Sequence, residues 1–293
     1  MTRQAIGIDT KKGMNVDVAD YDRDGRLDVY VTNITDEYMR ECNMLWHNEG
    51  PGPDGKVRFT DVSRETGTCN TLWGWAAKFG DFDNDGWEDL FAVCGLRSAG
   101  PENYIPVLLE MIIKPGIDFT DVRNYPAIGT MTWSGYQKKK LFRNLGGGTF
   151  REMAAAAGVD NDLDGRGIGM ADFDGDGLLD LYQTNANQPS LLYRNVSPRA
   201  GHWLALRLVG TRSNRDAIGA RVVVRAGRET WLREVNGGNG YAGQSTTRLH
   251  FGLGAVAKVD AVEVRWPSGL QETFRVPIDR STTIEEGRGE RRR

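Results

Sequence analysis

The sequence predicts an all-β protein: a partial β-propeller of about three blades, followed by a small antiparallel β-sandwich or barrel-like domain. Three observations support this fold class. An acidic loop of fixed spacing occurs three times, each copy runs into a short alternating strand, and the last third of the chain holds strand-like runs between glycine turns. The chain has 37 glycines among 293 residues and no long helical pattern, as expected of a turn-rich β protein.

The first acidic loop runs from Asp20 to Asp28 and reads DYDRDGRLD. Crowded carboxylates disfavour one another's ionised form unless a cation lies among them. Calcium takes six to eight oxygen ligands, and a D-x-D-x-D-G loop offers side chains at positions 1, 3 and 5 and a backbone carbonyl at position 7. Position 12 is Val31, not the glutamate of an EF-hand, so the aspartate at position 9 is expected to complete the site.

The same spacing starts again at residues 81 and 172, with aspartate at positions 1, 3, 5 and 9 and glycine at position 6. A single acidic loop can be a solvated turn, but three copies with similar flanks favour metal sites. A fourth loop, 160–165, has Ile168 at position 9 and is expected to bind calcium weakly or not at all. The predicted ligands are the side chains of Asp20, Asp22, Asp24, Asp28, Asp81, Asp83, Asp85, Asp89, Asp172, Asp174, Asp176 and Asp180, and the carbonyls of Arg26, Trp87 and Leu178.

Each loop belongs to a longer unit. A strand such as LDVYVTN, EDLFAVC or LDLYQTN follows the loop, and a later apolar run ends in a His-Asn or Arg-Asn step. This order corresponds to about one four-stranded propeller blade. The second interval between loops is longer than the first, which places an insertion at about 96–137. Its apolar run from Tyr104 to Ile113 predicts a short helix, either a partner surface or a cover for the blade edge.

These repeats resemble the FG-GAP/VCBS type found in the cartilage acidic protein family and its bacterial relatives. The C-terminal part resembles the ASPIC/UnbV domain through SNRDAIGAR at 213–221, GY at 240–241, QS at 244–245, HFGLG at 250–254 and WPSG at 266–269. The expected division is calcium-loop repeats at 1–198, an ASPIC/UnbV-like β domain at 199–287 and a charged, disordered tail at 288–293. The resemblance implies a secreted, extracellular or periplasmic interaction or adhesion module.

Composition narrows the partners. A formal charge of −3 gives no electrostatic footprint for nucleic acid, and no stretch is long enough to span a membrane. The segment Met1 to Gly7 shows no signal-peptide core, so we expect the N-terminus of the exported protein to be missing. Closed propellers have four to eight blades. The chain is therefore expected to be a fragment, or to have its open edges covered by the C-terminal domain or by another chain, as in a homo-oligomer.

Other motifs carry less chemistry. The cysteines Cys42, Cys69 and Cys94 lack metal-ligand spacing and are interpreted as buried thiols or as one pair with one free thiol. A G-x-G-x-x-G match at 238–243 is followed by an extended run instead of a helix, so no cofactor site is assigned. The histidines His47, His202 and His250 are scattered and are interpreted as packing or hydrogen-bonding residues, so no catalytic residue is assigned.

The leading functional hypothesis is a calcium-binding extracellular module with about three structural ions and an unidentified protein or glycan ligand. One alternative is an enzyme or an accessory protein of natural-product biosynthesis, for which a polar pocket around Arg215, Asp216, Glu234 and His250 would be the sign. Another alternative is a structural protein that assembles through open propeller edges.

Overall fold

The computed structural model describes residues 5–6, 11–118, 120–198, 201–238 and 240–291. Within these residues there are five sheets of three or more strands, and they form a propeller-like ring of five blades. The all-β prediction is confirmed, but the count of about three blades is wrong. The sequence count followed the acidic loops, and the last two sheets contain no such loop.

The first three sheets each contain one acidic loop. Sheet 1 has the order β1 (Asn15–Ala19), β2 (Asp28–Thr32), β5 (Met44–Pro51), β6 (Val57–Asp61). Sheet 2 has the order β7 (Gly74–Gly80), β8 (Asp89–Cys94), β9 (Lys140–Asn144), β10 (Phe150–Glu152). Sheet 3 has the order β11 (Gly165–Ala171), β12 (Asp180–Asn185), β13 (Gln188–Tyr193). A short hairpin, β3 (Thr35–Asp36) with β4 (Met39–Arg40), extends from sheet 1.

The pairing register puts every acidic loop at the same place in its sheet. Ala19 pairs with Asp28, Gly80 with Asp89, and Ala171 with Asp180, so each loop closes the hairpin between the first and second strands. The first strand, β1, alternates buried and exposed side chains, as its half-buried pattern requires. Apolar side chains pack between neighbouring sheets, with one cluster joining sheets 1 and 2 and another joining sheets 2 and 3.

The C-terminal sheets share a core of their own. One sheet has the order β17 (Leu249–Gly254), β14 (His202–Val209), β20 (Arg280–Glu285), with β14 and β20 parallel. The other has the order β16 (Glu229–Glu234), β15 (Arg221–Ala226), β18 (Ala261–Arg265), β19 (Gln271–Phe274), β21 (Glu290–Arg291). Both contribute to one buried cluster that includes Leu206, Val224 and Trp231. The expected disordered tail is partly ordered, because β21 pairs with β19.

The connection between β16 and β17 covers the inner strands of the first three sheets. The Tyr241 N–H donates to Asn15 Oδ1 of β1 at 2.8 Å, and the Tyr241 ring lies 4.9 Å from Trp75 of β7. The Thr246 N–H donates to the Met170 carbonyl of β11 at 3.1 Å. These contacts support the expectation that the C-terminal region covers open propeller edges.

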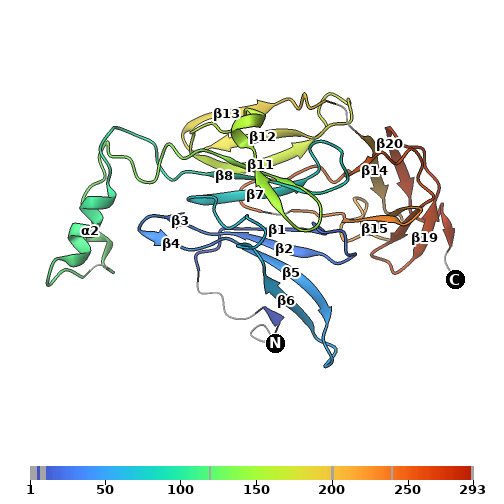
Figure 1. Cartoon of the computed structure of the whole chain (residues 1–293), viewed down its shortest axis with the longest axis horizontal. Helices are drawn as coiled ribbons and strands as arrows, with labels where there is room; N and C mark the ends of the chain where they lie inside the picture. Colours follow the sequence, from blue (N-terminus) through green and yellow to red (C-terminus); the bar gives the residue numbers. More distant parts are fainter. Residues whose placement is uncertain (1–4, 7–10, 119, 199–200, 239, 292–293) are drawn as a thin grey trace.

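The insertion lies between β8 and β9 and protrudes from the ring, at the left of Figure 1. It contains α2 (Ile105–Ile113) and the 3₁₀ turn η1 (Val122–Asn124); a second short helix, α3 (Ala154–Ala157), follows β10. Leu108 and Met111 of α2 are buried, whereas Leu109, Ile112 and Ile113 are exposed. No helix in the described part of the chain is long and apolar enough to cross a bilayer.

The cysteines form one pair with one free thiol. Cys42 and Cys69 are joined by a disulfide, and Cys94 is a buried free thiol within β8. Burial raises the pKa of the Cys94 thiol to about 11, so this thiol stays protonated at neutral pH. It is therefore a poor nucleophile.

Glu286 holds two turns of the C-terminal sheets together. Its Oε2 accepts the N–H groups of Thr211, Arg212 and Ser213 at 2.8–2.9 Å, and its Oε1 accepts the Ser268 hydroxyl. Burial alone would raise the pKa of Glu286, but these donors lower it from 4.5 to about 2.

The substitution Glu286→Gln is expected to lower the free energy of unfolding by about 2 kcal/mol at neutral pH, because five donors lose a charged acceptor. The folded pKa is below the usual value, so the advantage of wild type is full above about pH 4.5 and disappears toward pH 2. Urea unfolding at several pH values checks this expectation. The exposed neighbour Glu285 provides the control Glu285→Gln; equal stability of the two variants would contradict the expectation.

Candidate metal centres in the acidic loops

The three acidic loops are called loop 1 (20–28), loop 2 (81–89) and loop 3 (172–180), and their backbones follow the same course. Position 4 has a positive φ in each loop, 61° at Arg23, 58° at Asn84 and 76° at Gly175. The position 6 glycines have φ values of 84°, 94° and 91°. Glycine adopts this left-handed conformation without steric cost, which explains its place in the motif.

The aspartates at positions 1, 3 and 5 are held by N–H groups of their own loop. Position 1 accepts the N–H of the position 6 glycine at 3.1, 2.8 and 3.0 Å in loops 1, 2 and 3. Position 5 accepts the N–H of position 7 at 2.8, 2.9 and 3.0 Å. These bonds turn the carboxylates toward the inside of each loop, so the predicted side-chain ligands are brought together by local geometry.

The aspartate at position 9 links each loop to an asparagine in the third strand of its sheet or, in sheet 3, just after that strand. Its Oδ1 accepts the backbone N–H of the asparagine in the His-Asn or Arg-Asn step. The amide group of that asparagine donates to the carbonyl of position 8 at 3.0 Å in every loop. The asparagines are Asn48, Asn144 and Asn195. This aspartate therefore has a structural role in addition to any role as a ligand.

The asparagines of sheets 2 and 3 also reach the preceding sheet. Asn144 Nδ2 donates to the Tyr21 carbonyl of loop 1 at 2.9 Å, and Asn195 Nδ2 donates to the Phe82 carbonyl of loop 2 at 2.7 Å. Both acceptors are at position 2 of their loops. Neighbouring sheets are thus joined through the acidic loops.

Carboxylate oxygens gather within ligand distance in all three loops. Groups of oxygens within 4.8 Å of one another come from Asp20, Asp22 and Asp28, from Asp81, Asp83 and Asp85, and from Asp172, Asp174 and Asp180. Calcium prefers such oxygen ligands. The carbonyls of Arg26, Trp87 and Leu178 remain predicted ligands.

The pKa values of several of these carboxyl groups are raised because the groups are buried close to one another. Burial and the charges of the neighbouring aspartates raise the pKa of Asp28 to about 8, although the hydrogen bond from the Asn48 N–H acts in the opposite direction. Burial is also the main cause that raises the pKa of Asp20 to about 6, against the opposing charge of Arg233. The buried Asp81 and Asp89 are raised well above the usual carboxyl value. A divalent cation would offset this repulsion, so the donor set fits calcium.

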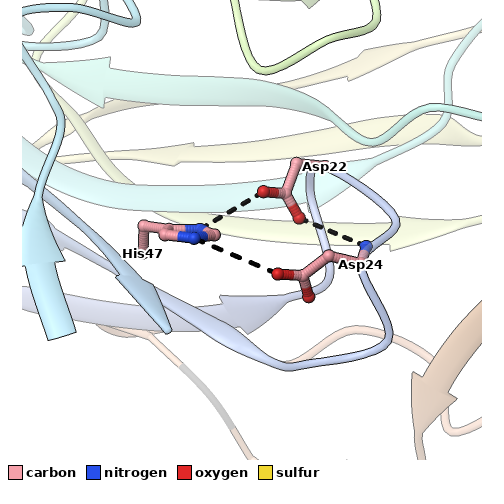
Figure 2. A group of neighbouring side chains, drawn as sticks. All are labelled: Asp22, Asp24 and His47. Carbon is pink, nitrogen blue, oxygen red and sulfur yellow. Dashed lines mark hydrogen bonds and ion pairs between the residues drawn. The ribbon is translucent and has the colours of Figure 1, made fainter. Parts of the chain in front are cut away.

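Basic side chains from the third strand, or from the residue just after it in sheet 3, lie beside the loops. Arg143 pairs with Asp83 at 2.8 Å and Asp85 at 3.3 Å, and Arg194 pairs with Asp174 at 2.6 Å. At the equivalent place in sheet 1 stands His47. Figure 2 shows its imidazole facing Asp22 and Asp24. The interpretation of His47 as a packing or hydrogen-bonding residue did not anticipate its place beside the loop carboxylates; its position in the His-Asn step was the sequence signal.

The fourth acidic stretch does not form a comparable group among the described residues. Asp160 faces Lys138 at 3.7 Å, and Asp164 accepts the Ser98 hydroxyl at 2.8 Å. These carboxylates are thus directed to separate partners. This arrangement supports the prediction that the stretch binds calcium weakly or not at all.

Two position 4 residues attach the loops to the C-terminal sheets. The Arg23 guanidinium lies between the rings of Trp87 and Trp231, at 4.8 and 4.6 Å from their centroids. Asn84 Oδ1 and His250 Nε2 are 2.7 Å apart. Burial and the charge of Arg233 lower the pKa of His250 to about 3, so the ring is neutral and donates to the amide oxygen.

A cavity of about 220 Å³ lies between β1, β7, β11 and the C-terminal sheets. Glu234 and His250 line it, whereas Arg215 and Asp216 do not. Two charged side chains that line the cavity, Arg233 and Glu88, form an ion pair with each other. The cavity is smaller than the roughly 300–1,000 Å³ of common ligand pockets. For the enzyme alternative, the cavity thus contains two of the four polar residues that the sequence suggested.

The remaining motifs do not extend the site. The G-x-G-x-x-G match includes Asn239, which lies outside the described residues, and its described part belongs to the connection between β16 and β17. His202 is partly exposed, and its Nδ1 lies 2.8 Å from Asp279 Oδ2. Neither residue belongs to an acidic loop.

Comparisons with known proteins confirm the resemblance drawn from the motifs. Residues 130–182 match the FG-GAP-like repeat, and residues 210–291 match the ASPIC and UnbV family. The chain is 28% identical to mouse cartilage acidic protein 1 over 97% of its own length and 38% of the relative's. It is 26% identical to the human protein over 90% of its own length and 35% of the relative's. The chain thus spans less than two fifths of these curated relatives.

Proposed function

We propose that this chain, an FG-GAP-like repeat protein with an ASPIC/UnbV domain, is an extracellular binding module whose acidic loops hold about three structural calcium ions. The similarity to cartilage acidic protein 1 supports the extracellular, secreted or periplasmic location. The observation that carries the metal assignment is the convergence of carboxylate oxygens in each of the three loops. The proposed side-chain ligands are the aspartates at positions 1, 3, 5 and 9, with the position 7 carbonyl as a further ligand.

The calcium would act as a structural element. Loops 1 and 2 contact the C-terminal sheets through Arg23 and Asn84, and loops 1 and 2 also accept bonds from the next sheet. An ion that fixes the loops therefore fixes the joints between sheets. No step of chemistry at the ion is required for this role.

Counting bound metal tests the proposal. Equilibrium dialysis against calcium, followed by elemental analysis, is expected to find about three ions per chain. The substitution Asp85→Asn keeps an oxygen for the Trp87 N–H but removes a charge from loop 2, so it should remove about one ion. Asp54→Asn, in the exposed turn between β5 and β6, is the control. No bound calcium, or an equal loss in both variants, would refute the assignment.

The insertion is the proposed partner surface. Leu109, Ile112 and Ile113 of α2 are exposed, and a groove of about 1260 Å³ runs between α2 and the β3–β4 hairpin. Tyr38, Leu72, Leu109 and Tyr136 are among the side chains that line it. Exposed apolar and aromatic side chains beside a rigid scaffold are typical of protein or glycan recognition.

A further inference from the structure

We propose that loop 1 differs from loops 2 and 3 in binding a divalent first-row transition-metal ion, with Asp20, Asp22, Asp28 and His47 as ligands. This inference rests on the proposed function in that it takes the acidic loops to be metal sites. It goes further by assigning a different class of ion to one loop. Three independent features of loop 1 lead to it.

The first feature is the position of the imidazole nitrogen. His47 Nδ1 lies 3.2 Å from Asp22 Oδ2 and 3.5 Å from Asp28 Oδ1. The nitrogen is buried and has no hydrogen-bond partner, so these short separations are not hydrogen bonds. Two ligand atoms that are each bound to one tetrahedral zinc ion lie about 3.3 Å apart, from the usual zinc–ligand lengths. The nitrogen and the oxygens thus have the spacing of ligands around a common ion.

The second feature is a pair of buried carboxylate oxygens without a partner. Asp20 and Asp28 are 2% and 0% exposed, and Asp20 Oδ1 and Asp28 Oδ2 accept no hydrogen bond. A buried anionic oxygen without a donor or a cation is unfavourable. Both residues belong to a group of oxygens within 4.8 Å of one another that also includes Asp22.

The equivalent oxygens of the other loops do have partners. In loop 2, Asp81 Oδ1 accepts the Asp85 N–H at 3.1 Å and Asp89 Oδ2 accepts the Phe82 N–H at 3.3 Å. In loop 3, the corresponding distances for the oxygens at positions 1 and 9 are 3.1 and 2.9 Å. The need for a cation is therefore greatest in loop 1.

The third feature is the replacement of a fixed positive charge. Arg143 and Arg194 pair with carboxylates of loops 2 and 3, whereas the same place in loop 1 holds His47. Within loop 1, Arg26 pairs with Asp24. The imidazole lies near the aspartates at positions 3, 5 and 9, and the aspartate at position 1 joins the site through its closeness to Asp22 and Asp28.

The donor set determines the class of ion. Calcium takes oxygen ligands, whereas imidazole is a common ligand of zinc, copper, nickel and iron. The far nitrogen, His47 Nε2, lies 4.0 Å from Asp24 Oδ2 and 4.0 Å from Glu49 Oε2. Carboxylates on the far side of a metal-bound histidine orient the ring and increase its basicity. In loop 1 these two carboxylates lie on that side of the ring without a hydrogen bond to it, so they add negative charge beside the imidazole.

Zinc dialysis in the presence of millimolar calcium tests the inference. Wild type is expected to bind one zinc ion per chain and to release one calcium ion from loop 1. His47→Gln removes the nitrogen ligand and keeps a neutral side chain, so zinc affinity should fall by more than the roughly tenfold to hundredfold loss of outer-shell substitutions. Its calcium count should remain that of wild type without zinc.

The control is His202→Gln, which removes an exposed histidine beside Asp279 and should leave zinc binding unchanged. Zinc binding that survives His47→Gln, or that is lost in His202→Gln, would overturn the inference. Calcium binding without zinc binding in wild type would overturn it and leave the proposed function standing. Failure to bind either metal would overturn both.

A measurement on wild type alone covers the case in which His47→Gln does not fold. Cobalt(II) titrated into the calcium-loaded protein should give visible absorption bands that change when zinc is added. A spectrum equal to that of free aqueous cobalt would contradict nitrogen ligation at loop 1.

Discussion

Removing calcium with a chelator is expected to lower the free energy of unfolding by roughly 5–8 kcal/mol for two to three loops, at free calcium about a hundredfold above Kd. Each ion that binds only the folded chain contributes about 2.7 kcal/mol under that condition. The physical reason is that burial and the neighbouring carboxylates both disfavour the ionised form of the loop aspartates. The effect is clearest at Asp28, whose pKa rises to about 8. Urea unfolding followed by tryptophan fluorescence would measure the difference.

Magnesium is the control for this expectation, since it requires a smaller octahedral site and retains its water ligands. Unfolding curves that coincide in calcium, magnesium and chelator would contradict the structural role of the ion. If magnesium raised the free energy of unfolding as much as calcium does, the result would show a general effect of divalent charge instead of a specific calcium site.

The second large effect is expected at the pair formed by Arg233 of β16 and Glu88 of loop 2. Their side chains are 12% and 6% exposed, and burial raises the pKa of Glu88 while Arg233 opposes this rise. Arg233→Met would leave Glu88 buried without a partner and should lower the free energy of unfolding by about 3–5 kcal/mol. Thermal or urea unfolding in constant calcium provides the measurement.

Two comparisons make this result specific. The double substitution Glu88→Leu with Arg233→Met should recover most of the loss, because apolar replacements of a buried pair are often tolerated. Arg225→Met breaks the more exposed pair with Glu263 and should cost less than about 1 kcal/mol. If Arg233→Met were as stable as Arg225→Met, the buried pair would not join the sheets as described.

The parts of the fold that depend on local spacing were predictable from the sequence. The acidic loops form hairpins because their position 1 aspartates accept the N–H of the position 6 glycines within the same nine residues. The helix at 105–113 follows from an apolar run. Five blades in place of about three could not be counted, because the C-terminal sheets share no repeat signature with the others.

The parts that depend on contacts between distant segments were not predictable. The place of His47 over loop 1 depends on the pairing of β2 with β5, in which Val29 faces Trp46. The disulfide joins Cys42 to Cys69, and spacing alone allowed other pairs. The C-terminal contacts of Arg23 cross more than two hundred residues and leave no pattern in the loop itself.

The asparagine bonds between sheets give the chain a direction of assembly. Asn144 and Asn195 each reach back to a carbonyl in the preceding loop, so a sheet obtains this bond only after the next sheet has been made. In arrays with nearest-neighbour coupling, stability spreads from one unit to the next. During synthesis on the ribosome, each newly emerged sheet would therefore consolidate the one before it, and the C-terminal region would close the structure last.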